Sequence, residues 1–124
     1  PIFMAYASQP ADLIYSITKA MITGYDAYKD AAPGADGLAV DRQILDWVLP
    51  YQKGAVKALK EAGAWKPEHE KHNQMLLKRQ ATLASAWDAF VKGSPPDDKD
   101  AFTKGWMAAR KAALTKLGMD PIFE

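Results

Sequence analysis

The stretch over residues 41–73 constrains the fold more than any other part of the chain, because it reads as a helix stop, a tight junction and a restart. Pro50 lacks a backbone donor and disfavours the helical conformation of the residue before it, so no helix is expected to pass through this point. A short helix is then predicted over 54–60, and Gly63 should end it. Pro67 stands where the first turn of a helix tolerates proline, so a new helix is predicted to begin there.

Helical periodicity recurs on both sides of this junction. Apolar residues return every three or four positions from about residue 8 to residue 29, which predicts one helix with a buried face. That face consists of Leu13, Ile17, Met21, Tyr25 and Tyr28. A further short helix is predicted over 40–48 and a long one over 67–91. A fifth helix should follow Asp97 and Asp98, because carboxylates suit the positive end of a helix.

The long helix and the fifth helix are joined by a short loop, so they are expected to pack antiparallel. Their apolar faces carry Leu83 and Trp87 on one helix and Phe102 and Trp106 on the other. We predict that all four side chains are largely buried. Gly105 is small, which allows the neighbouring helix to approach closely.

The first seven residues, Pro-Ile-Phe-Met-Ala-Tyr-Ala, form a compact apolar segment. Such a segment is typical of a short buried strand, so residues 1–7 are predicted to be a strand remnant. Residues 8–124 are then a helical region, and residues 1–124 are treated as a single unit, since a chain of this length suits one domain. The expected fold class is mostly α, with about five helices and the short N-terminal strand.

Charge and cysteine content exclude several classes of function. Sixteen basic and fifteen acidic side chains leave a net charge of +1, so there is no electrostatic case for binding nucleic acid. The absence of cysteine excludes disulfides and thiolate metal sites. No apolar run approaches the roughly 20 residues that a membrane helix needs.

His69 and His72 are the one candidate metal pair. They are three residues apart, so they share a helix face and could both reach a Zn²⁺ ion. The spacing differs from the His-Glu-x-x-His pattern of zinc proteases, and a solvated first helical turn explains the cluster better. The sequence also lacks a nucleophile elbow and a phosphate loop. We therefore expect no enzymatic activity, no cofactor and no metal.

Two tyrosines are candidate ligand-binding residues. Most tyrosine and tryptophan residues of the chain fall on apolar helix faces, where core packing explains them. Tyr6 and Tyr51 are different, because one stands at the end of the expected strand and the other at the helix junction. Two-lobed binding proteins tend to place pocket and hinge residues at such positions. Packing in the core or at a hinge remains the alternative interpretation.

The order of these segments resembles the C-terminal part of the TAXI family, the solute-binding proteins of tripartite ATP-independent periplasmic (TRAP) transporters. The resemblance lies in the junction over residues 41–73, in Ala5-Tyr6 and residues 12–21 upstream, and in residues 104–110 downstream. It therefore covers nearly the whole chain. Many family members carry Pro-x-His-x-Gly-Ala where this chain has Pro-Tyr-Gln-Lys-Gly-Ala, so Gln52 stands in the position of that histidine.

The resemblance implies the C-terminal portion of a larger, two-lobed α/β periplasmic binding protein of the second type. Such a receptor closes its lobes around a small anionic solute, such as an amino acid or a dicarboxylate, and then docks on the membrane subunits of the transporter. Tyr6, Tyr51 and Gln52 are the ligand-binding candidates within this chain. Most solute contacts are expected from the part of the receptor that precedes it.

Further expectations concern location and partners. The resemblance implies a periplasmic protein, and a fragment of a receptor is expected to form a homo-oligomer through residues 2–17, whose apolar groups would lack their normal neighbours. Two other classes of function stay open. One is a free-standing helical interaction module, and the other is a small metal-binding protein built on His69 and His72.

Overall fold

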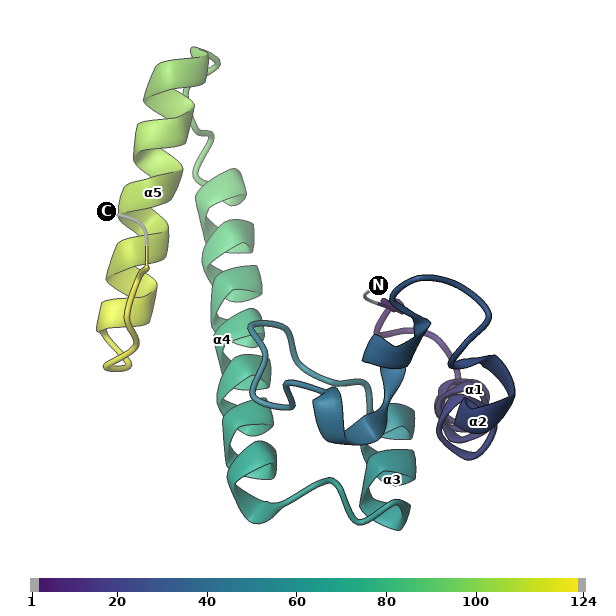
Figure 1. Ribbon diagram of the computed structural model, residues 1–124. Helices are drawn as coiled ribbons and strands as arrows, with labels where there is room; N and C mark the ends of the chain where they lie inside the picture. Colours follow the sequence, from purple (N-terminus) through teal and green to yellow (C-terminus); the bar gives the residue numbers. More distant parts are fainter. Residues whose placement is uncertain (1–2, 123–124) are drawn as a thin grey trace. The chain divides into compact units, whose positions relative to one another are not determined.

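The chain is mostly helical over the part that its computed structural model describes, residues 3–122 (Figure 1). Five α-helices and two 3-10 turns follow one another, and no strand occurs within that range. The elements are α1 (Ala11–Thr23), α2 (Tyr25–Tyr28), η1 (Ala35–Leu38), η2 (Val40–Arg42), α3 (Lys53–Glu61), α4 (Pro67–Lys92) and α5 (Lys99–Thr115). This confirms the expected helical character of the chain.

Two compact units make up the structure, where the sequence analysis treated the chain as one. The first ends at Gln74 and the second begins at Met75, so the division falls inside α4. The first unit contains α1, α2, both 3-10 turns, α3 and the first turns of α4. The second contains the remainder of α4 together with α5.

The prediction of a strand over residues 1–7 is wrong for residues 3–7, which form none. Residues 3–6 are irregular and residues 7–8 form a turn, in which the Gln9 amide donates to the Tyr6 carbonyl at 3.1 Å. Phe3 and Met4 are 67% and 80% exposed. A strand needs a neighbouring strand to pair its backbone groups, and the described residues supply none. Pro1 and Ile2 lie outside the described residues.

The single helix predicted over residues 8–29 is interrupted at Gly24. This glycine has φ −92° and ψ 6°, so α1 ends before it and α2 begins after it. The helix also begins later than residue 8, because Pro10 occupies the N-cap position and its carbonyl accepts from the Ile14 amide at 3.2 Å. Leu13 and Ile17, expected to be buried, are about half exposed.

The helix predicted over residues 40–48 forms only the 3-10 turn η2. Gln43 is extended, and its side-chain Nε2 donates to the Gly37 and Ala39 carbonyls at 3.0 and 2.9 Å. These bonds hold a loop conformation in place of a helical turn. The loop buries Leu45 and leaves Val48 72% exposed, so a single side chain anchors it to the core.

The junction and α3 agree with the sequence analysis. Glu61 is the last residue of α3, and Gly63 follows with φ 72°, a left-handed conformation that glycine adopts without steric cost. The core of the first unit is a cluster of buried side chains, against which other apolar residues pack. The cluster consists of Leu45, Val56, Leu59 and Trp65, and Ile22, Tyr51 and Ala64 pack on it.

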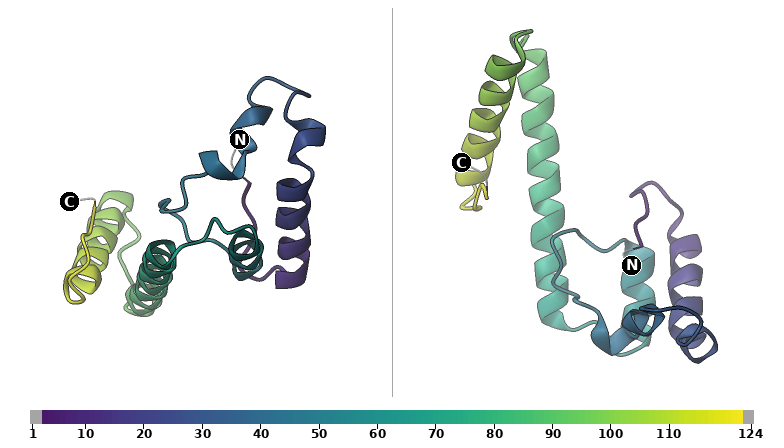
Figure 2. Two further views of the ribbon diagram at one scale, coloured as in Figure 1. Left: turned by 60° about the horizontal axis from the view of Figure 1, so that its bottom comes forward. Right: turned by 45° about the horizontal axis from the view of Figure 1, so that its top comes forward.

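Helices α1 and α3 lie side by side in both views of Figure 2. The two helices approach closely at Gly54, which is buried. A Cβ atom at this position would lie 2.0 Å from the Ala11 carbonyl oxygen and 2.7 Å from the Tyr15 amide nitrogen. Such distances are far below van der Waals contact, so the crossing of the two helices requires glycine here.

The second unit is an antiparallel helical hairpin, as predicted (Figure 1). Asp98 caps α5 by accepting the Ala101 amide at 2.8 Å, which confirms the expected acidic cap. Trp87 of α4 and Trp106 of α5 meet edge to face, with ring centroids 4.9 Å apart. The same ring cluster includes Phe90 and Phe102.

The aromatic rings of the hairpin are less buried than predicted. Trp87 is 41% exposed, and Leu83, Phe102 and Trp106 are only partly buried. Two helices cover one side of each large side chain and leave the other side open, which explains the difference. Leu114 of α5, in contrast, is fully buried.

Candidate functional site

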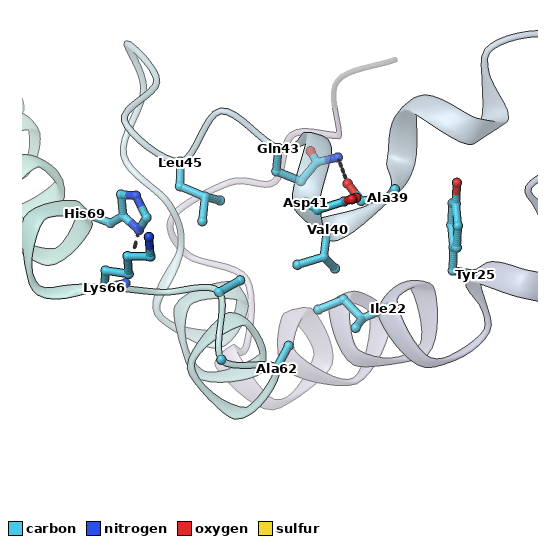
Figure 3. A pocket seen from close by; sticks show the side chains of 12 residues that line it. Ile22, Tyr25, Ala39, Val40, Asp41, Gln43, Leu45, Ala62, Lys66 and His69 are labelled. Atoms are coloured by element: carbon cyan, nitrogen blue, oxygen red, sulfur yellow. Dashed lines mark hydrogen bonds between the residues drawn. The ribbon is translucent and has the colours of Figure 1, made fainter.

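A hollow of about 590 Å³ opens on the first unit (Figure 3). Its walls come from α1 and α2, from the segment that contains η1 and η2, and from the connection between α3 and α4. Its apolar lining consists of Ile22, Ala39, Val40, Leu45, Ala62 and Ala64. The volume lies within the roughly 300–1,000 Å³ that small-molecule sites occupy. The hollow is therefore large enough for a small organic molecule.

Polar side chains stand on two sides of this apolar lining. Figure 3 shows His69 and Lys66 together at one end, with Asp41 and Gln43 on the wall nearer the 3-10 turns. Both hydrogen bonds of the Gln43 side chain use Nε2, so its Oε1 keeps its capacity to accept. Tyr25 completes the rim, and its hydroxyl donates to the Asp36 carbonyl at 3.0 Å.

The hydrogen bond of His69 determines which of its ring nitrogens carries the proton. Nδ1 accepts the backbone amide of Lys66 at 3.1 Å, an arrangement in which a side chain of the first helical turn caps the start of α4. An accepting Nδ1 bears no proton, so in the neutral ring the hydrogen is on Nε2. The free edge of this imidazole is therefore a donor.

The wall beside His69 is held in place by Trp65. The two rings pack with centroids 5.7 Å apart, and the indole N–H donates to Oε2 of Glu70 at 3.0 Å. The Lys60 ammonium, 2.9 Å from the same oxygen, is the largest cause of a low pKa at Glu70, and bonds from Gln74 and Trp65 add to it. Together these groups lower the pKa of Glu70 to about 2.

Tyr51, a candidate ligand-binding residue, packs against the core and does not line the hollow. Its ring meets Trp65 edge to face at 5.4 Å, and its hydroxyl donates to the Ile44 carbonyl at 3.1 Å. Its backbone amide donates to Oδ1 of Asn73 at 2.7 Å. Burial raises the pKa of the phenol. The residue thus ties the junction to the first turns of α4.

Gln52 and Tyr6, the other two candidates, are both hydrogen-bonded to the backbone of Gln9. Gln52 is the N-cap of α3, where Oε1 accepts the Gly54 amide, and its Nε2 donates to the Gln9 carbonyl at 3.1 Å. The Gln9 amide in turn donates to the Tyr6 carbonyl. The Tyr6 side chain is 79% exposed. Neither residue lines the hollow.

The two histidines do not converge on a common point. His72 donates its Nε2 proton to the Trp47 carbonyl at 2.7 Å, whereas His69 turns its Nδ1 to the start of α4. Over residues 3–122, no group of three or more His, Cys, Asp or Glu side chains is arranged to hold a metal ion. The pair therefore lacks the further ligands that a metal site needs.

Apart from His69, the residues that line the hollow carry no signal in the sequence that marks them as a site. Ile22, Asp41, Gln43 and Lys66 belong to three separated segments and share no spacing. The stretch over 40–48 was also expected to be helical, which would have directed Asp41 and Gln43 differently. Only the folded loop brings them together.

No protein-family model matches this sequence, and neither a curated protein nor a solved structure matches it. A functional interpretation therefore depends on the geometry above and on the resemblance described in the sequence analysis. Within the described helices, none has the length and the apolar character that would be needed to cross a membrane.

Proposed function

We propose that this chain is the C-terminal portion of a two-lobed periplasmic binding protein of the second type. The receptor would deliver a small anionic solute, such as an amino acid or a dicarboxylate, to the membrane subunits of a TRAP-type secondary transporter. The chain itself would contribute to binding and docking, not to catalysis. The proposal derives from the resemblance to the TAXI family and is supported by how the resembling segments meet.

The packing at Gly54 is the observation that carries this proposal. The upstream segment with the family resemblance, residues 12–21, lies on α1, and the junction over 50–55 begins α3. The two helices cross so closely that a Cβ on Gly54 would lie 2.0 Å from the Ala11 carbonyl oxygen. Gln52 adds a hydrogen bond to Gln9, just before α1. Segments far apart in sequence thus form one structural unit, as parts of one family fold would.

The exposed apolar side chains of the first unit support the proposal that the chain belongs to a longer receptor. Phe3 and Met4 are mostly exposed, and Leu13 and Ile17 are about half exposed on α1. Several exposed large apolar side chains are typical of a surface that another part of a protein covers. In the proposed receptor, the preceding part of the protein would cover this surface.

Two of the three candidate residues, Gln52 and Tyr51, would then support the site without contacting the solute. Both polar atoms of the Gln52 side chain are engaged, one at the cap of α3 and one at the Gln9 carbonyl. The Tyr51 hydroxyl is engaged at Ile44. In a receptor that works by closing two lobes, such residues stiffen the hinge region, and affinity comes from groups placed in the cleft.

A test of the proposal uses the native protein. An antibody raised against the 124-residue chain would isolate it from periplasmic extract of the source cells, and mass spectrometry would give its length. Calorimetry would then measure binding of glutamate, succinate and related solutes. We expect a longer periplasmic protein that binds one of them with low-micromolar or tighter affinity, while the chain alone does not.

Two results would contradict the receptor. One is a native protein no longer than this chain that binds none of the solutes. The other is sub-micromolar binding of such a solute by the chain alone, because a cleft between two lobes needs both lobes.

A free-standing helical interaction module is the second candidate function. The half-exposed Trp87 and Val91 on α4 favour it, because exposed aromatic and aliphatic side chains on a helix can anchor a partner. The two candidates differ in cellular location and in solute binding, so the isolation experiment also distinguishes them.

A further inference from the structure

The loop over residues 44–49, between η2 and α3, displays large apolar side chains on the surface of the first unit. The exposed ones, between 37% and 72% accessible, are Ile44, Trp47, Val48 and Leu49. Leu45, by contrast, turns inward and belongs to the buried core (Figure 3). So many exposed apolar side chains within one short loop are typical of an interaction surface.

Side chains from the junction and from α4 hold this loop in its conformation. The Tyr51 hydroxyl donates to the Ile44 carbonyl at 3.1 Å, and Nε2 of His72 donates to the Trp47 carbonyl at 2.7 Å. Tyr51 is itself fixed, because its backbone amide donates to Oδ1 of Asn73 at 2.7 Å. A partner would therefore meet a surface that is already ordered, and binding would lose little conformational entropy.

The segment that carries the loop is acidic, although the whole chain has a net charge of +1. Three aspartates and one arginine over residues 35–52 give this segment −2, and they are Asp36, Asp41, Asp46 and Arg42. Arg42 pairs with Asp36. Asp46 stands within the apolar run and is exposed. Its charge adds to the effect of burial in raising the pKa of the Tyr51 phenol, so the carboxylate lies near the hydroxyl that holds the loop.

We propose that this loop docks onto a basic amphipathic helix of a partner protein. The apolar face of such a helix would cover Ile44, Val48 and Leu49, and a lysine or arginine at the border of that face would pair with Asp46. Helix recognition of this kind combines apolar anchors with complementary charge. The inference rests on the first unit alone, so it holds whether or not the chain belongs to the proposed receptor.

Charge distinguishes this partner from the other surfaces that could cover the loop. A bilayer is disfavoured, because the Asp46 carboxylate would have to leave water and anionic lipid headgroups would repel the acidic segment. A second copy is disfavoured as well, because a two-fold contact through the loop would bring two acidic segments together. A basic amphipathic helix supplies both the apolar surface and the opposite charge.

Peptide binding to the 124-residue chain tests the inference. The probe is a fluorescently labelled helical peptide with leucine along one face and lysine along the other. One control peptide carries glutamate in place of every lysine, and a second keeps the leucine–lysine composition in an order that forms no apolar face. Fluorescence anisotropy should give a dissociation constant of about 100 μM for the probe and at least about ten-fold weaker binding for each control. Amide shifts in a ¹⁵N-labelled sample should concentrate over residues 41–52.

Variants of the loop separate its apolar and its charged contribution. Val48→Ser should weaken binding of the leucine–lysine peptide about ten-fold. Asp46→Lys should weaken it to a similar extent and should make the leucine–glutamate peptide the tighter ligand. Val91→Ser and Asp88→Lys are the matched controls, because both residues are exposed in the second unit, and each should change the affinity less than about two-fold. Far-ultraviolet circular dichroism would verify that each variant is folded, and Asp46→Asn offers a milder change if the charge reversal disturbs the loop.

Several results would overturn the inference. The leucine–lysine peptide could show no saturable binding up to about 1 mM, the leucine–glutamate peptide could bind equally well, or Val48→Ser could have no more effect than Val91→Ser. Co-sedimentation with vesicles of phosphatidylcholine and phosphatidylglycerol that is lost in Val48→Ser would assign the loop to a bilayer. Loss of self-association in the same variant would assign it to a second copy. None of these results bears on the proposed receptor, whose test measures solutes on the longer native protein.

Discussion

The indole N–H of Trp65 donates a 3.0 Å hydrogen bond to Oε2 of Glu70, and this bond closes the short connection between α3 and α4. Trp65 is only 8% exposed, so its one polar atom needs a partner, and the carboxylate supplies it. The Lys60 ammonium approaches the same oxygen at 2.9 Å. One carboxylate thus joins the last turn of α3, the connection and the first turn of α4.

Stability should fall in acid as this carboxylate becomes protonated. The pKa of Glu70 is lowered from 4.5 to about 2, first by Lys60, so its stabilising effect is present above pH 4.5 and is lost as the pH falls toward 2. The side chain is 38% exposed, so we expect a contribution of at most about 1 kcal/mol. The free energy of unfolding, measured with urea from pH 6 to pH 2, should decline less steeply for Glu70→Gln than for the unaltered chain. Glu68→Gln is the control, and equal slopes for the Glu70 variant and the unaltered chain would contradict the assignment.

Adding one methyl group at Gly54 should destabilise the first unit. The Cβ of Gly54→Ala would lie 2.0 Å from a backbone oxygen of α1, so the two helices must separate. We expect a loss of at least about 1–3 kcal/mol, the usual cost of overpacking, in urea unfolding. Gly37→Ala is the matched control, because nothing lies within 4 Å of a Cβ there. Equal stability of the two variants would show that the helices do not cross at Gly54.

Truncation of Leu114 should be the most costly change in α5. This side chain is fully buried, so Leu114→Ala removes apolar contacts and leaves a cavity, at a cost of about 2–5 kcal/mol. Leu117→Ala, three residues on and 45% exposed, should cost less than about 1 kcal/mol. Thermal and urea unfolding would compare them. A similar loss for both would mean that the buried face of α5 is misassigned.

Trp87 and Trp106 should be energetically coupled although neither is fully buried. Their rings meet edge to face at 4.9 Å, a geometry worth about 0.5–1.5 kcal/mol beyond area burial. A double-mutant cycle with Trp87→Leu and Trp106→Leu would measure the coupling from unfolding free energies. Because Trp87 is 41% exposed, its single variant should cost less than the roughly 3–5 kcal/mol of a buried tryptophan. Strict additivity of the two changes would argue against the contact.

The isolated chain should self-associate through the exposed apolar side chains of its N-terminal segment and of α1. Sedimentation velocity at tens of micromolar is expected to show a dimer or a higher oligomer. The reason is that these apolar side chains are exposed to solvent and can be buried by a second copy of the chain. Ile17→Glu should reduce the associated fraction. Val91→Glu, at a residue of the second unit with similar exposure, should reduce it less. A compact monomer of the unaltered chain would contradict this prediction.

The sequence by itself determined where several helices begin and end, because helix ends depend on local effects. Pro50 and Gly63 bound α3, Pro67 starts α4 and Asp98 caps α5, as expected. Each of these signals acts through the residue's own backbone or through atoms a few positions away. Such effects can be derived without knowing the rest of the fold.

Tertiary structure decided the features that depend on distant partners. Whether Phe3 lies in a strand depends on a neighbouring strand, and whether Leu13 is buried depends on which face of α1 meets α3. The hollow is the clearest case, because Asp41 and Lys66 come to its rim from segments with no common pattern. Helix periodicity reveals an apolar face but not the surface that will cover it, and only the packed chain supplies that surface.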